Sequence, residues 1–115
     1  AGMGPAFLRH VQRCKVLLHV VDGTSADPVQ DFITINNELR NYDPYLAEKP
    51  QVVVLNKLDV TSVKDSEEEL LQRLREEAGH TRVLSISAAT THNVKELMQR
   101  LKKFVSMQPD ADLPP

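Results

Sequence analysis

Several features are scarce or missing in this sequence, and each absence argues against a class of protein. The single cysteine, Cys14, cannot form a disulfide within the chain, which favours a reducing compartment. No apolar run approaches the roughly 20 residues of a membrane-spanning helix, and residues 1–5 lack the charged and apolar regions of a signal peptide. We therefore expect a protein of the cytoplasm or of an organelle interior, with no membrane partner.

An excess of positive charge is also lacking. The formal net charge is −2 and the isoelectric point is about 6.1, so there is no electrostatic argument for binding to nucleic acid. Hydrophobic residues make up 41% and charged residues 26% of the chain, which is typical of a globular protein. A length of 115 residues is sufficient for one small domain with a modest core.

Apolar runs and amphipathic segments alternate along the chain. Strands are predicted over residues 15–22, 52–55 and 82–87, and helices over about 5–13, 28–41, 66–78 and 93–107. Strands separated by helices indicate an α/β fold, in which a parallel sheet with right-handed crossovers lies between flanking helices as three layers. Three strands are few for such a sheet, so its edges are expected to be exposed and the chain resembles half of a doubly wound domain.

Local signals mark several helix ends. Asp27 and Pro28 are suited to the N-cap and first position of a helix, and Gly79 is suited to the position just after one. Ser66 and Glu69 have the spacing of a capping box. Residues 108–115, which include three prolines, are predicted to form a flexible tail after a domain of residues 1–107.

The helical periodicity predicts which side chains face the core. We expect Cys14 to be buried as a small hydrophobe and His19 to be a core residue rather than a ligand. The apolar faces of the helices are predicted to contain Phe7, Leu8, Val11, Val29, Phe32, Ile35, Leu39, Tyr42, Leu70, Leu71, Leu74, Val94, Leu97, Met98, Leu101, Phe104 and Val105.

Polar residues follow each predicted strand, at Asp22, at 56–59 and at 87–89. The carboxyl ends of parallel strands meet at one edge of a sheet, where ligands bind in open α/β folds. An ionised Asp59 accepts two parallel N–H donors, and guanine offers such a pair whereas adenine does not. The stem of Lys57 can lie along a ring, and the N–H of Ala88 is free of a bulky side chain that would block a base oxygen.

These motifs resemble those of a known class of proteins. Asn56-Lys57-Leu58-Asp59 fits the fourth motif of translation-factor-class GTPases, and Ser87-Ala88-Ala89 fits the fifth. More narrowly, residues 7–14, 16–22 and 49–50 are similar to the Obg family of GTPases. The resemblance implies a partial P-loop NTPase fold, the carboxyl-terminal half of a G domain, in a parent GTPase that acts with the ribosome or a ribosomal subunit.

The family pattern implies a role for each matching residue. Asp59 would hold the guanine ring N–H and amine, Lys57 would stack on the base, and Asn56 would brace the site. Ser87 would support the loop, and the N–H of Ala88, next to Ala89, would meet the guanine oxygen. The implied ligand is GTP or GDP.

Other elements of the family are missing from this sequence. None of the four glycines opens a Gly-x4-Gly-Lys-Ser/Thr phosphate loop, and no Asp-x-x-Gly segment follows a strand. Magnesium would then belong to the parent protein alone, since no ligand for it is expected in this chain. We predict that the chain by itself recognises a base and does not hydrolyse GTP.

Two other interpretations compete with this one. The chain could be a non-catalytic α/β module that binds no nucleotide and contacts other proteins, or a copy of itself, through an exposed sheet edge. A phosphoacceptor domain that uses Asp22 and Lys57 is the weaker alternative, because further acidic residues are missing. Asp22 is better explained as a residue that stabilises the turn at Gly23. No metal site is expected, because the four histidines and Cys14 lack ligand spacing.

Overall fold

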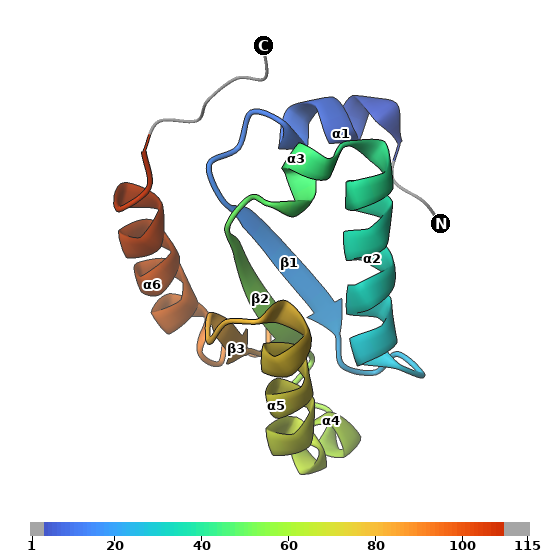
Figure 1. Cartoon of the computed structure of the whole chain (residues 1–115). Helices are drawn as coiled ribbons and strands as arrows, with labels where there is room; N and C mark the ends of the chain where they lie inside the picture. Colours follow the sequence, from blue (N-terminus) through green and yellow to red (C-terminus); the bar gives the residue numbers. More distant parts are fainter. Residues whose placement is uncertain (1–3, 110–115) are drawn as a thin grey trace.

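A three-stranded parallel sheet is the centre of the fold. The computed structural model describes residues 4–109, and its strands are β1 (Leu17–Asp22), β2 (Gln51–Asn56) and β3 (Val83–Ser85) in the order β1-β2-β3. The helices are α1 (Pro5–Val11), α2 (Pro28–Tyr42), α3 (Pro44–Ala47), α4 (Thr61–Asp65), α5 (Glu67–Ala78) and α6 (Val94–Ser106) (Figure 1).

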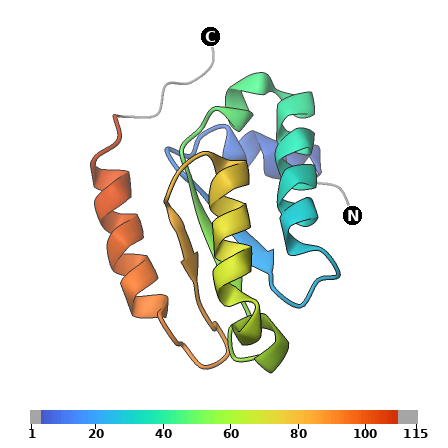
Figure 2. The ribbon, with the colours of Figure 1, turned by 60° about the horizontal axis from the view of Figure 1, so that its bottom comes forward.

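Helices cover the two faces of the sheet, which gives the three layers that the sequence predicts. On one face, α2 and α5 pack over a core that contains Phe32, Val53 and Leu74. On the other face, α6 packs its Leu97 against Val54, and Figure 2 shows α6 on the opposite side of the sheet from α2 and α5. The predicted α/β fold with a parallel sheet is therefore confirmed.

Two of the three predicted helix-end signals are confirmed. The side chain of Asp27 accepts a hydrogen bond from the N–H of Gln30, and Gly79 has a φ of 74° after α5. The capping box at Ser66 was a wrong prediction, because its side chain makes no capping hydrogen bond. Ser66 also ends α4, with φ −100° and ψ 5°, so its backbone lacks the extended conformation that an N-cap requires.

Two short helices, α3 and α4, lie between the predicted elements. Asp43 caps α3 by accepting a hydrogen bond from the N–H of Tyr45, and the fully buried Leu46 anchors this helix. Val63, which is 1% exposed, anchors α4 in the same way. Helices of four and five residues are too short to show a 3.6-residue periodicity, which explains why the pattern did not predict them.

Several predicted core residues are exposed instead. Cys14 is exposed in the turn after α1, where its thiol contacts the carbonyl oxygen of His10. Phe7, Tyr42 and Met98 are 54%, 41% and 54% exposed. Tyr42 is the last residue of α2, and Met98 follows the buried Leu97, so each lies outside the part of its helix that contacts the sheet.

Residues 110–115 of the predicted tail lie outside the described residues. Over residues 4–109, no helix is both long enough and apolar enough to cross a membrane.

Candidate functional site

The carboxyl ends of the three strands bring the predicted site residues to one edge of the sheet. Asp22, the last residue of β1, lies opposite Asn56, the last residue of β2. Ser85, the last residue of β3, lies opposite Leu55. The polar segments that follow each strand therefore begin side by side, as parallel pairing requires.

Asn56 links two of these segments. Its Oδ1 accepts one hydrogen bond from the N–H of Lys57 at 2.7 Å and another from the N–H of Ala88 at 3.0 Å. The segment after β2 is thus tied to the segment after β3, across 32 residues of sequence. This amide oxygen is therefore one link between the two motifs.

A second link joins Ser87 to Asp59. The hydroxyl of Ser87 donates to Oδ1 of Asp59 at 2.8 Å and accepts from the N–H of Thr90 at 3.2 Å. Ser87 is 1% exposed, whereas Asp59 is exposed. The buried hydroxyl therefore orients the carboxylate, whose other oxygen makes no hydrogen bond within the described part of the chain.

Lys57 reaches toward the end of β1. Its backbone adopts a φ of 70°, an uncommon value outside glycine, and its ammonium donates to Oδ2 of Asp22 at 3.0 Å. Oδ1 of Asp22 accepts from both the hydroxyl and the N–H of Thr24, at 2.6 and 2.8 Å. These contacts, the Thr24 hydroxyl foremost and Lys57 next, lower the pKa of Asp22 to about 2.

Polar contacts from α5 and α6 support the segment after β3. The side-chain amide of Asn93, at the start of α6, donates to the carbonyl oxygen of Ser85 at 2.9 Å. The hydroxyl of Ser85 donates to Glu67, and this bond lowers the pKa of the Glu67 carboxyl. Thr91 and Asn93 both have positive φ, of 64° and 63°, so the loop is held in a conformation that side chains rarely adopt.

The structure joins most of the predicted site residues. Asn56, Ala88, Ser87 and Asp59 form the two links, and Lys57 pairs with Asp22, while Ala89 is exposed beside them. Sequence reasoning missed two participants, Thr24 and Thr90, which contact Asp22 and Ser87. Each lies two or three residues after its partner, a spacing typical of local hydrogen bonds between side chain and backbone.

The expected role of Asp22 in the turn agrees with its bonds to Thr24, and its ion pair with Lys57 was not predicted. Among the described residues there is no group of three or more His, Cys, Asp or Glu side chains that could hold a metal ion.

Curated proteins align with nearly the whole chain, although no family model matches it. The chain is 45% identical over 113 residues to a GTPase Obg of Synechococcus sp. (strain JA-3-3Ab), which covers 98% of this chain and 29% of that protein. It is 43% identical over 115 residues to a GTPase Obg of Caldicellulosiruptor saccharolyticus, with 97% and 26% coverage. The resemblance to the Obg family of GTPases is confirmed.

The match concerns only one part of these Obg proteins, because the chain spans less than a third of the length of the relatives named above. A solved structure of Era, in complex with MgGDPNP and nucleotides 1506–1542 of 16S ribosomal RNA, has a similar fold. The TM-score is 0.62 at 24% identity, over 94% of this chain and 34% of that one. The fold is thus that of part of a GTPase.

Proposed function

We propose that the carboxyl edge of this sheet is the guanine-recognising part of an Obg-type GTP-binding protein. In this proposal Asp59 accepts the ring N–H and the exocyclic amine of guanine, which adenine cannot supply as a pair. Lys57 lies along the base, and Asn56 and Ser87 hold the two loops in place. Ala88 and Ala89 present backbone close to the base oxygen.

The observation that carries this proposal is the pair of links between the two motifs. The hydroxyl of Ser87 orients Asp59 by a hydrogen bond, and Oδ1 of Asn56 accepts from the N–H of Ala88. In the free protein both motifs are therefore held in one position, and the link through Ser87, which base binding leaves intact, lowers the entropic cost of orienting Asp59. Oδ2 of Asp59 has no partner among the described residues and Oδ1 keeps one acceptor site beside the Ser87 bond, so the carboxylate can still accept two N–H donors.

Two contacts of the structure would have to change when a base binds. The N–H of Ala88 would exchange Oδ1 of Asn56 for the base oxygen, and Lys57 would leave Asp22 to lie along the ring. The ion pair is solvent-exposed on both sides, at 46% and 49%, and exposed pairs contribute little to stability. Breaking this ion pair therefore costs little free energy, and base binding would release Asp22 from Lys57.

The activity of the longer protein is a separate part of the proposal. Its relatives are named GTPases, so we infer that the full-length protein hydrolyses GTP with magnesium and acts with the ribosome or a ribosomal subunit. The chain supplies the base-recognising region, residues 1–107 being the carboxyl-terminal half of a G domain. The sequence printed here contains no phosphate loop or switch motif, and the affinity for phosphates would come from elsewhere in the protein.

Exchange of Asp59 for asparagine tests the central assignment. Asp59→Asn replaces an acceptor with a donor, so GDP binding should weaken about 10- to 100-fold, the equivalent of a lost charged hydrogen bond of about 1.5–3 kcal/mol. Xanthosine diphosphate, which has a carbonyl in place of the amine, should then bind better than GDP. Calorimetric titration of the full-length protein measures both affinities.

A matched control is Asp65→Asn, at the end of α4, which removes the same charge from the same segment without touching the motifs. This variant should retain the affinity and selectivity of the wild type. If Asp59→Asn bound GDP as the wild type does and still rejected the xanthine nucleotide, the assignment of Asp59 would be wrong.

An exposed edge favours a second candidate, self-association through β1. β1 is an edge strand of the described sheet, and its Leu18 and Val20 are 43% and 52% exposed. Unpaired strand edges pair with other chains unless something covers them. In this case two copies would join through β1, and sedimentation of the 115-residue chain would show a dimer. A monomer at high concentration would exclude this candidate.

A further inference from the structure

A partly buried carboxylate lies next to the carboxyl end of β3. Glu67, the first residue of α5, has a side chain that is 21% exposed. Its Oε2 accepts a hydrogen bond from the hydroxyl of Ser85, and its Oε1 accepts one from the ammonium of Lys64 at 3.1 Å. One side chain thus joins α4, α5 and β3 at the point where β3 ends.

Ser85, the partner of Glu67, is held by more than one bond. It is the last residue of β3 and is 8% exposed. Its hydroxyl donates to Glu67, and its carbonyl oxygen accepts from the side-chain amide of Asn93 at 2.9 Å. The N–H of the next residue, Ile86, donates to a carbonyl oxygen of β2 at 2.8 Å. These bonds fix the position from which the segment 87–89 begins.

Two pairs of a serine and a carboxylate follow one another along this segment. Ser85 donates to Glu67, and Ser87, two residues further on, donates to Asp59. Residues two apart in extended backbone place their side chains on the same side, so both hydroxyls reach acids of the segment between β2 and α5. Asp59 is exposed to a ligand, whereas both oxygens of Glu67 bind protein groups.

A place in the first turn of a helix does not account for the contacts of Glu67. The helix dipole stabilises acids there, and α5 begins with three of them, Glu67, Glu68 and Glu69. Glu68 and Glu69 are exposed, and only the first of the three binds Ser85. The hydroxyl of Ser85 is the main cause of the lowered pKa of Glu67, burial acts against it, and Lys64 lowers the pKa further. The hydrogen bond therefore favours an ionised carboxylate.

The position of the segment after β3 decides the geometry of the proposed guanine site. The hydroxyl of Ser87 reaches Oδ1 of Asp59 at 2.8 Å, and the N–H of Ala88 reaches Oδ1 of Asn56 at 3.0 Å. A shift of about 1 Å would take either bond beyond hydrogen-bonding distance. The orientation of Asp59 thus depends on what holds the end of β3.

We propose that Glu67 is a positioning residue for guanine recognition. Its carboxylate holds Ser85 and thereby the end of β3. From there Ser87 orients Asp59, and Ala88 lies where it meets the base oxygen. This inference rests on the function proposed above, and it adds to the site a residue that lies outside both motifs and acts through Ser85 rather than on the nucleotide.

Discrimination between GDP and inosine diphosphate measures this role. Hypoxanthine lacks the exocyclic amine that Asp59 would bind and keeps the ring N–H and the oxygen, so the ratio of the two affinities reports how well Asp59 is oriented. Partial unfolding lowers both affinities alike and leaves the ratio unchanged. In calorimetric titrations of the full-length protein, the wild type should prefer GDP about 10-fold or more, the effect of one charged hydrogen bond.

Two variants remove the same bond from its two ends. Glu67→Ala and Ser85→Ala should each reduce the preference for GDP about threefold, the size of a coupling between residues in contact. The double variant should reduce it no further, because the single variants already lack the bond. Without nucleotide, both single variants should shift the amide signals of Ser87 and Ala88 in the ¹⁵N-labelled chain.

Glu68→Ala is the matched control, because it removes the same charge from the same turn of α5 at an exposed position. It should keep the wild-type ratio. An unchanged ratio in Glu67→Ala and Ser85→Ala, beside a wild type that prefers GDP, overturns the role of Glu67 and leaves the guanine site standing. An equal loss of preference in Glu68→Ala overturns it as well. A wild type that binds both nucleotides alike would contradict the role of Asp59 itself, and this inference would fall with it.

Discussion

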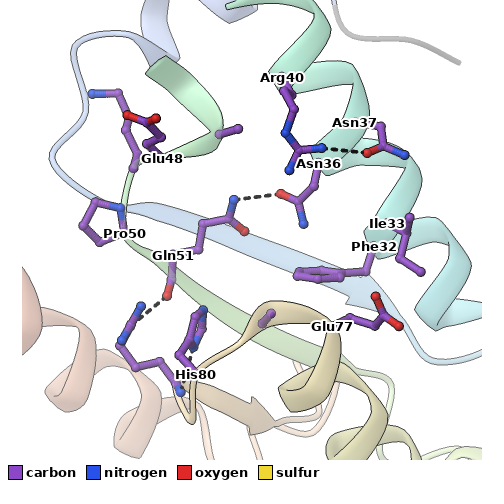
Figure 3. Close-up of a pocket in the computed structure, with 14 residues that line it drawn as sticks. Phe32, Ile33, Asn36, Asn37, Arg40, Glu48, Pro50, Gln51, Glu77 and His80 are labelled. Carbon is purple, nitrogen blue, oxygen red and sulfur yellow. Dashed lines mark hydrogen bonds between the residues drawn. The ribbon is translucent and has the colours of Figure 1, made fainter. Parts of the chain in front are cut away.

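The two edges of the sheet differ in how their polar groups are satisfied. At the carboxyl edge, exposed groups bind one another across loops, as Asn56 binds Ala88 and Lys57 binds Asp22. At the amino edge, the side-chain amide of Gln51 is buried and donates to Oδ1 of Asn36 (Figure 3). The polar contacts of the first edge are open to water, whereas those of the second are held in the packed interior.

The two edges also differ in how their residues are distributed along the chain. The carboxyl-edge residues lie in two short runs, 56–59 and 87–89, directly after strands. The polar contacts of the amino edge join α2, β2 and the segment after α5, since Gln51 binds Asn36 and Arg82. A site made of contiguous residues can be predicted from a motif, whereas a site that only folding assembles leaves no such pattern.

Removal of a shared core side chain should damage both edges at once. Leu55 in β2 is fully buried, so Leu55→Ala should lower the free energy of unfolding by about 2–5 kcal/mol. Urea denaturation measures this loss, and amide shifts should move at both edges. Leu18→Ala, at a 43% exposed position of β1, is the control and should cost far less. Equal losses in the two variants would contradict the packing described here.

Substitution of Gly23, which follows β1, should disturb the structure of the carboxyl edge alone. A Cβ added at Gly23 would lie 2.6 Å from Cγ1 of Val63 and 2.7 Å from the carbonyl oxygen of Asn56. Gly23→Ala should therefore cost about 1–3 kcal/mol of stability and shift the amide signals of Asn56 and Ala88, while those of Gln51 stay in place. Thermal unfolding and amide spectra measure the two effects.

Gly79→Ala is the matched control for this steric effect. Nothing lies within 4 Å of a Cβ at Gly79, but its φ of 74° disfavours alanine by about 1–2 kcal/mol. This variant should lose stability without moving the signals of Asn56. A Gly23→Ala protein with unchanged signals at Asn56 and Ala88 would show that the turn and the site are independent.

The smallest expected effect concerns the protonation of Asp22. Its pKa of about 2 lies below the ordinary value of 3.8, so the stabilisation it provides is present above pH 3.8 and is lost as the pH falls through 2. Thr24→Val, which removes the hydroxyl, and Lys57→Met, which removes the ion pair, should each raise this pKa towards its ordinary value. The ¹³C shift of the Asp22 carboxyl, followed against pH, measures the pKa, and a pKa unchanged in both variants would contradict this account.

Much of the scaffold could be predicted from the sequence because its signals are local. Three apolar runs, the cap at Asp27 and the glycine after α5 all match the structure. The capping box failed because Ser66 ends one helix as it begins another. Cys14 and Met98 failed because apolar character predicts burial only where another element covers the residue, and coverage depends on tertiary packing.

In the candidate site, too, local signals were predictive and tertiary contacts were not. The meeting of the two motifs at one edge follows from parallel strands, and the structure places them there. The ion pair between Lys57 and Asp22 and the donation of Ala88 to Asn56 depend on side-chain geometry that no spacing encodes.

Recognition of guanine at the carboxyl edge is tested most directly by titration of the labelled chain with GDP and with ADP. We predict that GDP alone shifts the amide signals of residues 56–59 and 87–89, with the largest change at Ala88 as its N–H leaves Asn56. Well-dispersed spectra that respond to both nucleotides alike, or to neither at millimolar concentration, would contradict a base-recognising role for this chain.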